Sequence, residues 1–140
     1  MRRALLAALL LAISAAPVSA EELAVIVHGA RTDRPNVAEL AQIYLKQRRF
    51  WADGARIVAV NRESGSESRT AFEAAVFGAR AAQLPVYWNR QYFQGVLPPA
   101  TLASDEAVKR FVASEREAIG YVHPAVVDDS VTVVLKLTHP

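Results

Sequence analysis

The chain has 140 residues and no cysteine, which excludes disulfide bonds, thiolate metal sites and a cysteine nucleophile. Its length suits one domain with a hydrophobic core, and a hydrophobic content of 52% is that of a folded protein rather than a disordered one. There are 16 basic and 14 acidic residues and no basic run, so the charge gives no support for a nucleic-acid partner.

Residues 1–20 have the pattern of a secretory signal peptide. Two arginines precede an apolar run over residues 4–16, and the small residues 18–20 stand before a glutamate. The run is shorter than the roughly 20 residues that a membrane-spanning helix needs. We therefore expect cleavage after Ala20, an exported periplasmic protein without a membrane span, and a mature domain of residues 21–140. Removing the two arginines from the 16 basic residues leaves 14, against 14 acidic ones, so this domain is close to neutral.

The first half of the mature chain predicts two units in which a strand leads into a helix. Residues 23–27 are a short apolar run typical of a buried strand. Asn36, followed by Glu39, resembles a capping box at the start of a helix that ends near Lys46. A second strand is expected at about residues 56–60, after a turn that contains glycine.

The remaining elements alternate in the same way. A loop over residues 62–68 leads into a helix that ends at Gly78, and a helix over residues 82–93 carries aromatic side chains that we expect to belong to the core. Ser104 begins a fourth helix as its N-cap. Two strands close the chain, at 118–122 and 131–137. Because strands alternate with helices, we predict a single three-layer α/β domain with a central, mainly parallel sheet flanked by helices.

The loop after the second strand has the composition of an anion site. Arg62 offers a bidentate guanidinium, and the neighbouring serines offer hydroxyl donors. Gly65 tolerates backbone angles closed to other residues, and the first N–H groups of the following helix lack intrahelical partners. In open α/β sheets, ligands bind beyond the carboxyl ends of strands, where this loop lies. The predicted ligand-binding residues for phosphate or another small oxyanion are Arg62, Ser64, Gly65, Ser66, Ser68 and Arg69.

Other interpretations of these residues stay open. Ser66 or Ser68 can act only as a helix cap, with Arg62 paired to a surface carboxylate. His28, Gly29 and Arg31, near the end of the first strand, are either plain loop residues or another wall of the site, because the adjoining loop is expected to leave the same edge of the sheet. We expect no catalysis because a Gly-x-Ser-x-Gly elbow is absent. We expect no metal or other cofactor because the histidines lack metal-ligand spacing.

The loop also resembles the phosphate-binding proteins of bacterial ABC uptake systems. Their loop has the pattern Arg-x-Asp-Gly-Ser-Gly-Thr, with a phenylalanine four residues after the threonine. The matching positions here are Arg62, Gly65, Ser66 and Phe72, with Ser68 in place of the threonine. Three further segments resemble that family: residues 40–45, 51–54 and 118–122. The resemblance implies one lobe of a type II periplasmic binding protein, phosphate as ligand, and an ABC permease as partner.

Two residues and the chain length depart from that family. Ser64 stands in place of the aspartate that accepts a hydrogen bond from protonated phosphate, and Glu67 stands in place of a glycine. A carboxylate at about 4 Å from a bound dianion repels it by several kcal/mol at a partly buried surface. The chain also has residues for only one of the two lobes. An alternative function is therefore a ligand-free module that docks another exported protein or forms a homodimer.

Overall fold

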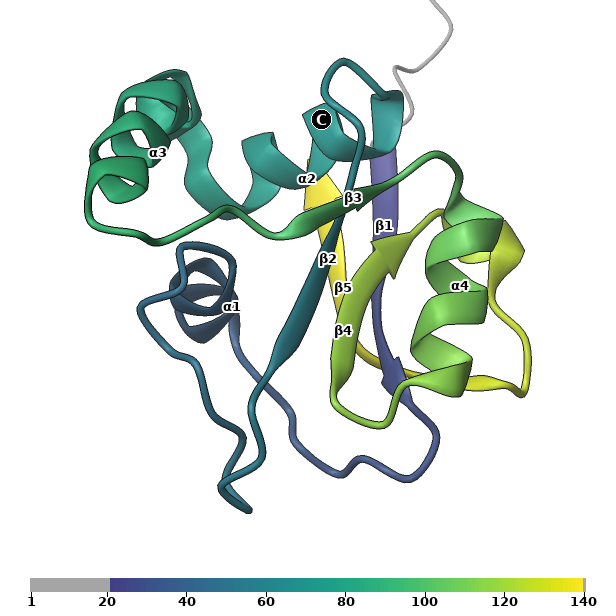
Figure 1. Ribbon diagram of the computed structural model, residues 1–140. Helices are drawn as coiled ribbons and strands as arrows, with labels where there is room; N and C mark the ends of the chain where they lie inside the picture. The colour runs from purple at the N-terminus through teal and green to yellow at the C-terminus, as the bar shows by residue number, and fades with distance from the viewer. Residues whose placement is uncertain (1–20, 140) are drawn as a thin grey trace, which may run out of the picture.

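The computed structural model describes residues 21–139, so the predicted signal peptide lies outside the described residues (Figure 1). The strands are β1 (Glu21–His28), β2 (Val58–Arg62), β3 (Ala100–Leu102), β4 (Ala118–Val122) and β5 (Val131–His139). The α-helices are α1 (Val37–Tyr44), α2 (Glu67–Phe77), α3 (Leu84–Phe93) and α4 (Asp105–Ser114). Two short 3₁₀ helices are η1 (Gly78–Gln83) and η2 (Pro124–Val126).

The five strands form one sheet in the order β3-β2-β4-β1-β5. β2 is parallel to β3 and to β4, whereas β1 is antiparallel to both of its neighbours, β4 and β5. Four of the five strands therefore point the same way, and the predicted mainly parallel α/β sheet is confirmed. Because β1 alone is reversed, its carboxyl end lies at the opposite edge of the sheet from those of β2, β3 and β4.

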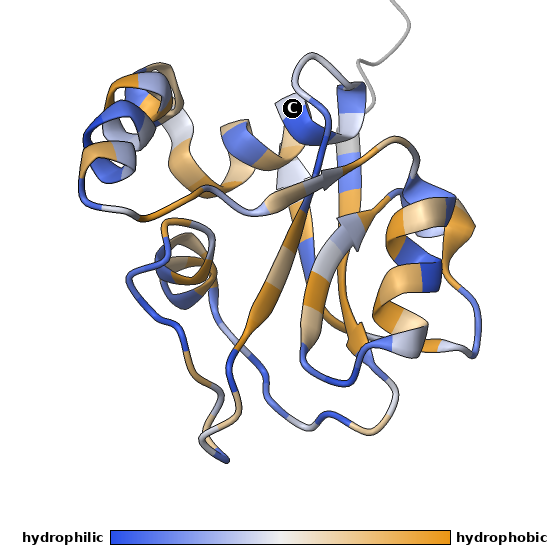
Figure 2. Ribbon diagram, viewed as in Figure 1, coloured by the Kyte–Doolittle hydropathy of each residue, from blue (hydrophilic) through white to orange (hydrophobic). Residues whose placement is uncertain are grey.

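Helices cover both faces of the sheet, which gives the three layers (Figure 1). On one face, α1 and α2 pack on alternate residues of β1 and β4; the largest buried side chains there include Leu40, Ile43, Phe72, Ile119 and Tyr121. On the other face, α4 packs Val108 and Val112 against the intervening residues of the same strands. Strands buried on both faces are apolar throughout, which explains the continuous hydrophobic runs in the sequence (Figure 2).

Two strands differ from the sequence-based prediction. β3 was not predicted, because three residues with two of them exposed are too short for a periodic pattern. β2 extends to Arg62 instead of ending near residue 60, so it includes a polar pair. Asn61 is buried there because the Tyr121 hydroxyl donates a hydrogen bond to its side-chain oxygen.

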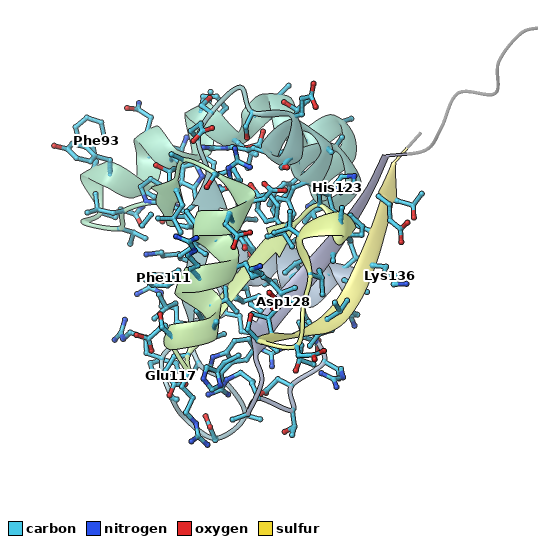
Figure 3. All side chains as sticks on the ribbon, turned by 90° about the vertical axis from the view of Figure 1, so that its right-hand side faces the viewer. Phe93, Phe111, Glu117, His123, Asp128 and Lys136 are labelled. Carbon is cyan, nitrogen blue, oxygen red and sulfur yellow. The ribbon has the colours of Figure 1, made fainter. Side chains whose placement is uncertain are left out.

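α3 lies beside the sheet rather than on it, at the edge of the molecule (Figure 1). The prediction that its aromatic face belongs to the core is wrong, because none of its residues is buried and Tyr92 and Phe93 are 64% and 80% exposed. Figure 3 shows Phe93 at the outer edge of this region. A hydrogen bond of 2.6 Å from the Tyr87 hydroxyl to the Leu45 carbonyl connects α3 to the end of α1. Within residues 21–139, no helix is long and apolar enough to cross a membrane.

Candidate functional site

The carboxyl ends of β2, β3 and β4 meet at one edge of the sheet, and the predicted loop lies at this edge. Arg62, the last residue of β2, pairs in register with Leu102, the last residue of β3. The Glu63 N–H donates to the Leu102 carbonyl at 3.3 Å, which holds the start of the loop against the neighbouring strand. His123 follows β4 at the same edge. This is where ligands bind in open α/β sheets.

The Arg62 side chain is held by groups of the protein itself. Its Nε donates to the Leu102 carbonyl at 3.2 Å, and its Nη2 lies 3.0 Å from the Glu63 carboxylate. Its Nη1 forms an ion pair with Asp105, and only 11% of the Arg62 side chain is exposed. Burial lowers the pKa of Arg62, but hydrogen bonds and attraction from Glu63 and Asp105 outweigh it and raise the pKa above its ordinary value. The Arg62 guanidinium therefore stays protonated.

The Asp105 carboxylate is the point on which several donors converge. Besides the guanidinium of Arg62, the Ser68 hydroxyl lies 3.0 and 3.2 Å from its two oxygens. The backbone N–H of His123 donates to Oδ2 at 2.7 Å. Asp105 is the first residue of α4, so its negative charge also lies at a helix N-terminus. An internal carboxylate thus holds two of the side chains predicted to bind an external oxyanion.

The loop itself folds as a tight turn that caps α2. Gly65 has a φ of +85°, a conformation that favours glycine, and the Ser66 N–H donates to the Glu63 carbonyl at 3.2 Å. The Ser66 hydroxyl accepts a hydrogen bond of 3.2 Å from the Arg69 N–H and so serves as the N-cap. Ser64 is exposed on the turn.

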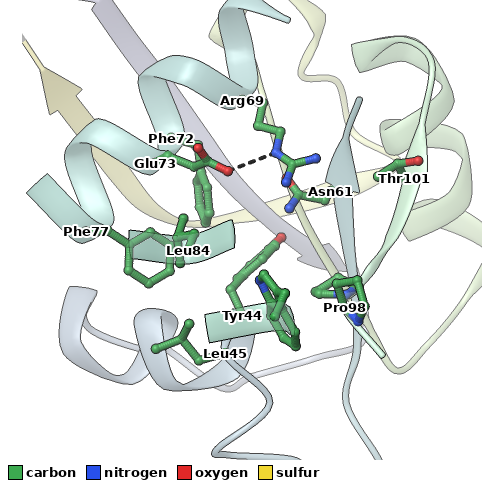
Figure 4. Close-up of a pocket in the computed structure, with 12 residues that line it drawn as sticks. Tyr44, Leu45, Asn61, Arg69, Phe72, Glu73, Phe77, Leu84, Pro98 and Thr101 are labelled. Carbon is green, nitrogen blue, oxygen red and sulfur yellow. Dashed lines mark hydrogen bonds and ion pairs between the residues drawn. The ribbon is translucent and has the colours of Figure 1, made fainter. Parts of the chain in front are cut away.

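Arg69 braces the loop from the side of α2. Its Nε forms an ion pair of 2.9 Å with Glu73 (Figure 4). Its Nη1 donates to the Arg62 carbonyl at 3.1 Å. The side chains of Arg69 and Glu73 line a cavity of about 70 Å³ among α1, α2 and β2. Glu67 is exposed, and among the described residues neither Arg62 nor Arg69 pairs with it.

Tyr121 connects the site to the core. Its hydroxyl accepts the Arg62 N–H at 3.2 Å, and its ring stacks on Phe72 with 3.9 Å between ring centres. Burial raises the pKa of Tyr121 above its ordinary value, so the phenol stays protonated at neutral pH. Phe72, which matches the family pattern in the sequence, is therefore a core residue that fixes the backbone of Arg62 through Tyr121.

His28, Gly29 and Arg31 lie at the opposite edge of the sheet, so the alternative in which they form another wall of the site is wrong. The reason is the reversed direction of β1. Arg31 is buried there and pairs with Asp33 at 3.0 Å, with Asp53 at 3.5 Å, and with Glu117. Its guanidinium carbon also lies 4.6 Å from the centre of the Trp51 ring. Arg31 thus has a structural role.

Two groups of the site, Asp105 and the His123 N–H, were not predicted from the sequence. Asp105 was assigned only to the first turn of its helix, where acidic residues are common. Its contact with Arg62 joins residues far apart in the chain, and no local sequence pattern predicts such a contact. Only the neighbouring positions of β2, β3 and β4 bring these groups together.

Solved structures similar to this chain include three phosphate-transport proteins. A phosphate ABC transporter substrate-binding protein from Clostridium perfringens, solved with bound phosphate, has a TM-score of 0.63 and 28% identity over 82% of this chain and 44% of its own. An ABC-type phosphate transport receptor from Vibrio cholerae has a TM-score of 0.66 and 19% identity over 86% of this chain and 55% of its own. PstS from Borrelia burgdorferi has a TM-score of 0.63 and 14% identity over 84% of this chain and 48% of its own.

No protein-family model matches the sequence, and no curated protein sequence does. The chain spans about half the length of the solved structures that it resembles. Together with the loop motif, these structures confirm the resemblance inferred from the sequence: over about half of their length, this chain is similar to phosphate ABC transporter substrate-binding proteins.

Proposed function

We propose that this domain is an exported, non-catalytic binding module that holds phosphate or a similar small oxyanion at the loop over residues 62–68. The observation that carries the proposal is the convergence of Arg62, the Ser68 hydroxyl and the His123 N–H on one carboxylate. A carboxylate and a phosphate accept hydrogen bonds in the same way, so a donor set that holds one suits the other. The similar C. perfringens protein was solved with phosphate bound.

In this proposal the Asp105 carboxylate competes with the external ligand. An anion that approaches Arg62 meets a guanidinium already paired with Asp105 and Glu63. Two charges 4 Å apart interact by about 4 kcal/mol at the effective dielectric constant of a protein surface. We therefore expect a modest wild-type affinity. An ABC permease is the partner that fits this function.

Calorimetry with phosphate and with sulfate tests the proposal. Asp105→Asn keeps the side-chain shape but removes the competing charge, so we expect it to bind phosphate at least about tenfold more tightly than wild type, a gain of about 1.4 kcal/mol. Adding Arg62→Ala to this variant should abolish the gain. Asp129→Asn removes an exposed carboxylate and is the matched control, because it changes the net charge equally.

The same series decides between this proposal and a ligand-free module. If neither wild type nor Asp105→Asn gives heat with millimolar phosphate or sulfate, oxyanion binding is excluded. Protein–protein interaction is then the better assignment, favoured by the exposed Tyr92 and Phe93 on α3. Sedimentation of wild type and Phe93→Asp would test a homodimer, and a monomer at all concentrations would count against it.

A further inference from the structure

A second cavity, of about 300 Å³, lies near the amino end of β2, away from the serine loop at its carboxyl end. It opens between the end of α1, the start of β2 and the segment that follows α3. Its wall carries four basic side chains, Lys46, Arg48, Arg49 and Arg56. Its apolar lining is Ile43, Ile57, Ala59, Val96 and Leu97. The volume is at the lower end of the range for small-molecule sites, which combine an apolar lining with a few polar groups.

The positive charge of this wall is largely uncompensated. Within residues 21–139, Arg48 alone among the four has a carboxylate partner, Glu39 at 3.3 Å. The Arg49 Nε donates to the Lys46 carbonyl at 2.9 Å. The guanidinium carbon of Arg56 lies 5.4 Å from the centre of the Phe50 ring. Several cations around one cavity repel each other, so the arrangement favours an anion between them.

The pKa of Lys46 is consistent with this repulsion among the basic side chains. Burial lowers it from its ordinary value, and repulsion by Arg49 and by Arg56 lowers it further. A negatively charged group in the cavity would relieve both of these repulsions.

Lys46 also occupies a backbone position that suits glycine. At the end of α1, its N–H donates to the Ile43 carbonyl at 3.1 Å, and the next N–H donates to the Gln42 carbonyl at 2.9 Å. These two bonds form a Schellman motif, in which the residue at Lys46 adopts the left-handed conformation. Its φ is +56°, and within residues 21–139 it is the one residue other than glycine with a positive φ. This conformation is unfavourable for a residue with a Cβ atom.

The end of α3 provides an internal comparison. It has the same pair of hydrogen bonds, from Gly95 to the Tyr92 carbonyl at 3.0 Å and from Val96 to the Gln91 carbonyl at 3.0 Å. There the left-handed residue is glycine, with a φ of +76°. Both residues line the cavity, and the chain has a lysine rather than a glycine at the first of these two positions. Strained residues of this kind cluster at functional sites.

We infer that this cavity is a second binding site, for a small organic anion whose phosphate or carboxylate group contacts Lys46, Arg49 and Arg56 and whose apolar body lies on Ile57 and Leu97. This site is independent of the proposed oxyanion site at residues 62–68. The apolar lining distinguishes it from a site for inorganic phosphate, because a bare anion gains nothing from burying that surface. Phenyl phosphate and benzoate represent the two charged groups on one aromatic body.

Lys46→Gly is the decisive variant. Glycine relieves the backbone strain at this position, which stabilises the protein, and it also removes the ammonium group that contacts the ligand, which weakens binding. We expect a higher thermal midpoint than wild type, together with at least fivefold weaker binding of phenyl phosphate by calorimetry. Lys46→Asn also removes the charge, and asparagine tolerates the left-handed conformation, so it should weaken binding without a change of fold. Lys136→Ala, at an exposed position on β5 (Figure 3), is the charge control and should bind as wild type does.

Arg62→Ala separates the two sites, and phenyl phosphate should bind it as tightly as it binds wild type. Weaker binding to Arg62→Ala with unchanged binding to Lys46→Gly and Lys46→Asn would assign the probe to the serine loop and overturn the inference. Inorganic phosphate that binds Arg62→Ala as tightly as phenyl phosphate does would also overturn it, because the apolar lining would then contribute nothing to binding at this cavity. No binding of phenyl phosphate or benzoate at millimolar concentration would overturn it as well, whatever the outcome at the serine loop.

Discussion

Gly120 of β4 lies in close contact with α4. A Cβ atom added there would lie 2.6 Å from Val108 Cγ1, 3.1 Å from Val60 Cγ2 and 3.3 Å from Val112 Cγ2. The first distance is shorter than any ordinary contact between carbon atoms. The β-branched side chain of Val108 has little rotamer freedom in a helix, so α4 itself would have to shift. Because α4 begins with Asp105, the glycine also fixes the position of the carboxylate at the site.

We therefore predict that Gly120→Ala destabilises the protein by about 1–3 kcal/mol, the usual cost of overpacking a well-filled core. Urea unfolding measures the change. Gly29→Ala is the control, since a Cβ atom there meets nothing within 4 Å, and it should cost much less. Adding Val108→Ala to Gly120→Ala should recover part of the loss. Equal stability of the two glycine variants would contradict the proposed contact.

At the scale of single elements, α1 depends on the capping box that begins it. The Asn36 side chain accepts the Glu39 N–H at 2.8 Å, and the Glu39 carboxylate accepts the Asn36 N–H at 3.0 Å. The helix has only 8 residues, so an unsatisfied first turn affects a large part of it. Its far end carries Lys46 and therefore the wall of the basic cavity.

Replacing this cap should destabilise the protein measurably. We predict that Asn36→Ala lowers the free energy of unfolding by about 1 kcal/mol, the typical value for loss of an N-cap side chain. Chemical denaturation followed by circular dichroism gives the value. Gln42→Ala, at an exposed position of the same helix, should change stability little. A loss no larger than that of the Gln42 variant would mean that tertiary packing alone holds the start of α1.

The capping box shows which elements the sequence could predict. Asn36, Ser66 and Ser104 each cap the helix that follows them, and each signal lies within a few residues of its partner. Apolar runs, or for β5 the alternation of apolar residues, likewise identified four of the strands. Signals of this kind are local, so a single sequence contains them.

Contacts between distant segments could not be predicted in this way. The reversal of β1 is determined by which strands become neighbours, and residues 28–31 were assigned to the wrong edge for that reason. The pairing of Arg62 with Asp105 depends on the same strand order. The amphipathic pattern of α3 indicated a core helix, but the sheet has no free face where α3 lies. The predicted loop therefore lies at the carboxyl ends of β2, β3 and β4 as expected, while the groups that occupy its donors were not predicted.

At the scale of the whole molecule, the helices differ in how deeply they are packed. Val108 and Val112 anchor α4 in the core, whereas α3 has no buried residue. Among the contacts that order α3 is the hydrogen bond from the Tyr87 hydroxyl to the Leu45 carbonyl. The Tyr87 ring also makes an edge contact with the Trp88 ring, at 5.0 Å between ring centres. Opening α3 would expose little apolar surface, so its free energy should be far below that of global unfolding.

Hydrogen exchange measured by mass spectrometry tests this difference. We predict that amides of residues 84–97 exchange through a local opening, at a lower free energy than those of residues 105–114. Tyr87→Phe removes the hydrogen bond to the Leu45 carbonyl and should speed exchange in 84–97 by about fivefold, the effect of losing a bond worth about 1 kcal/mol, while leaving 105–114 unchanged. Exchange of both segments at one common free energy would mean that α3 opens only with the whole domain. Since residues 95–97 line the basic cavity, phenyl phosphate should slow exchange in the first segment and spare the second.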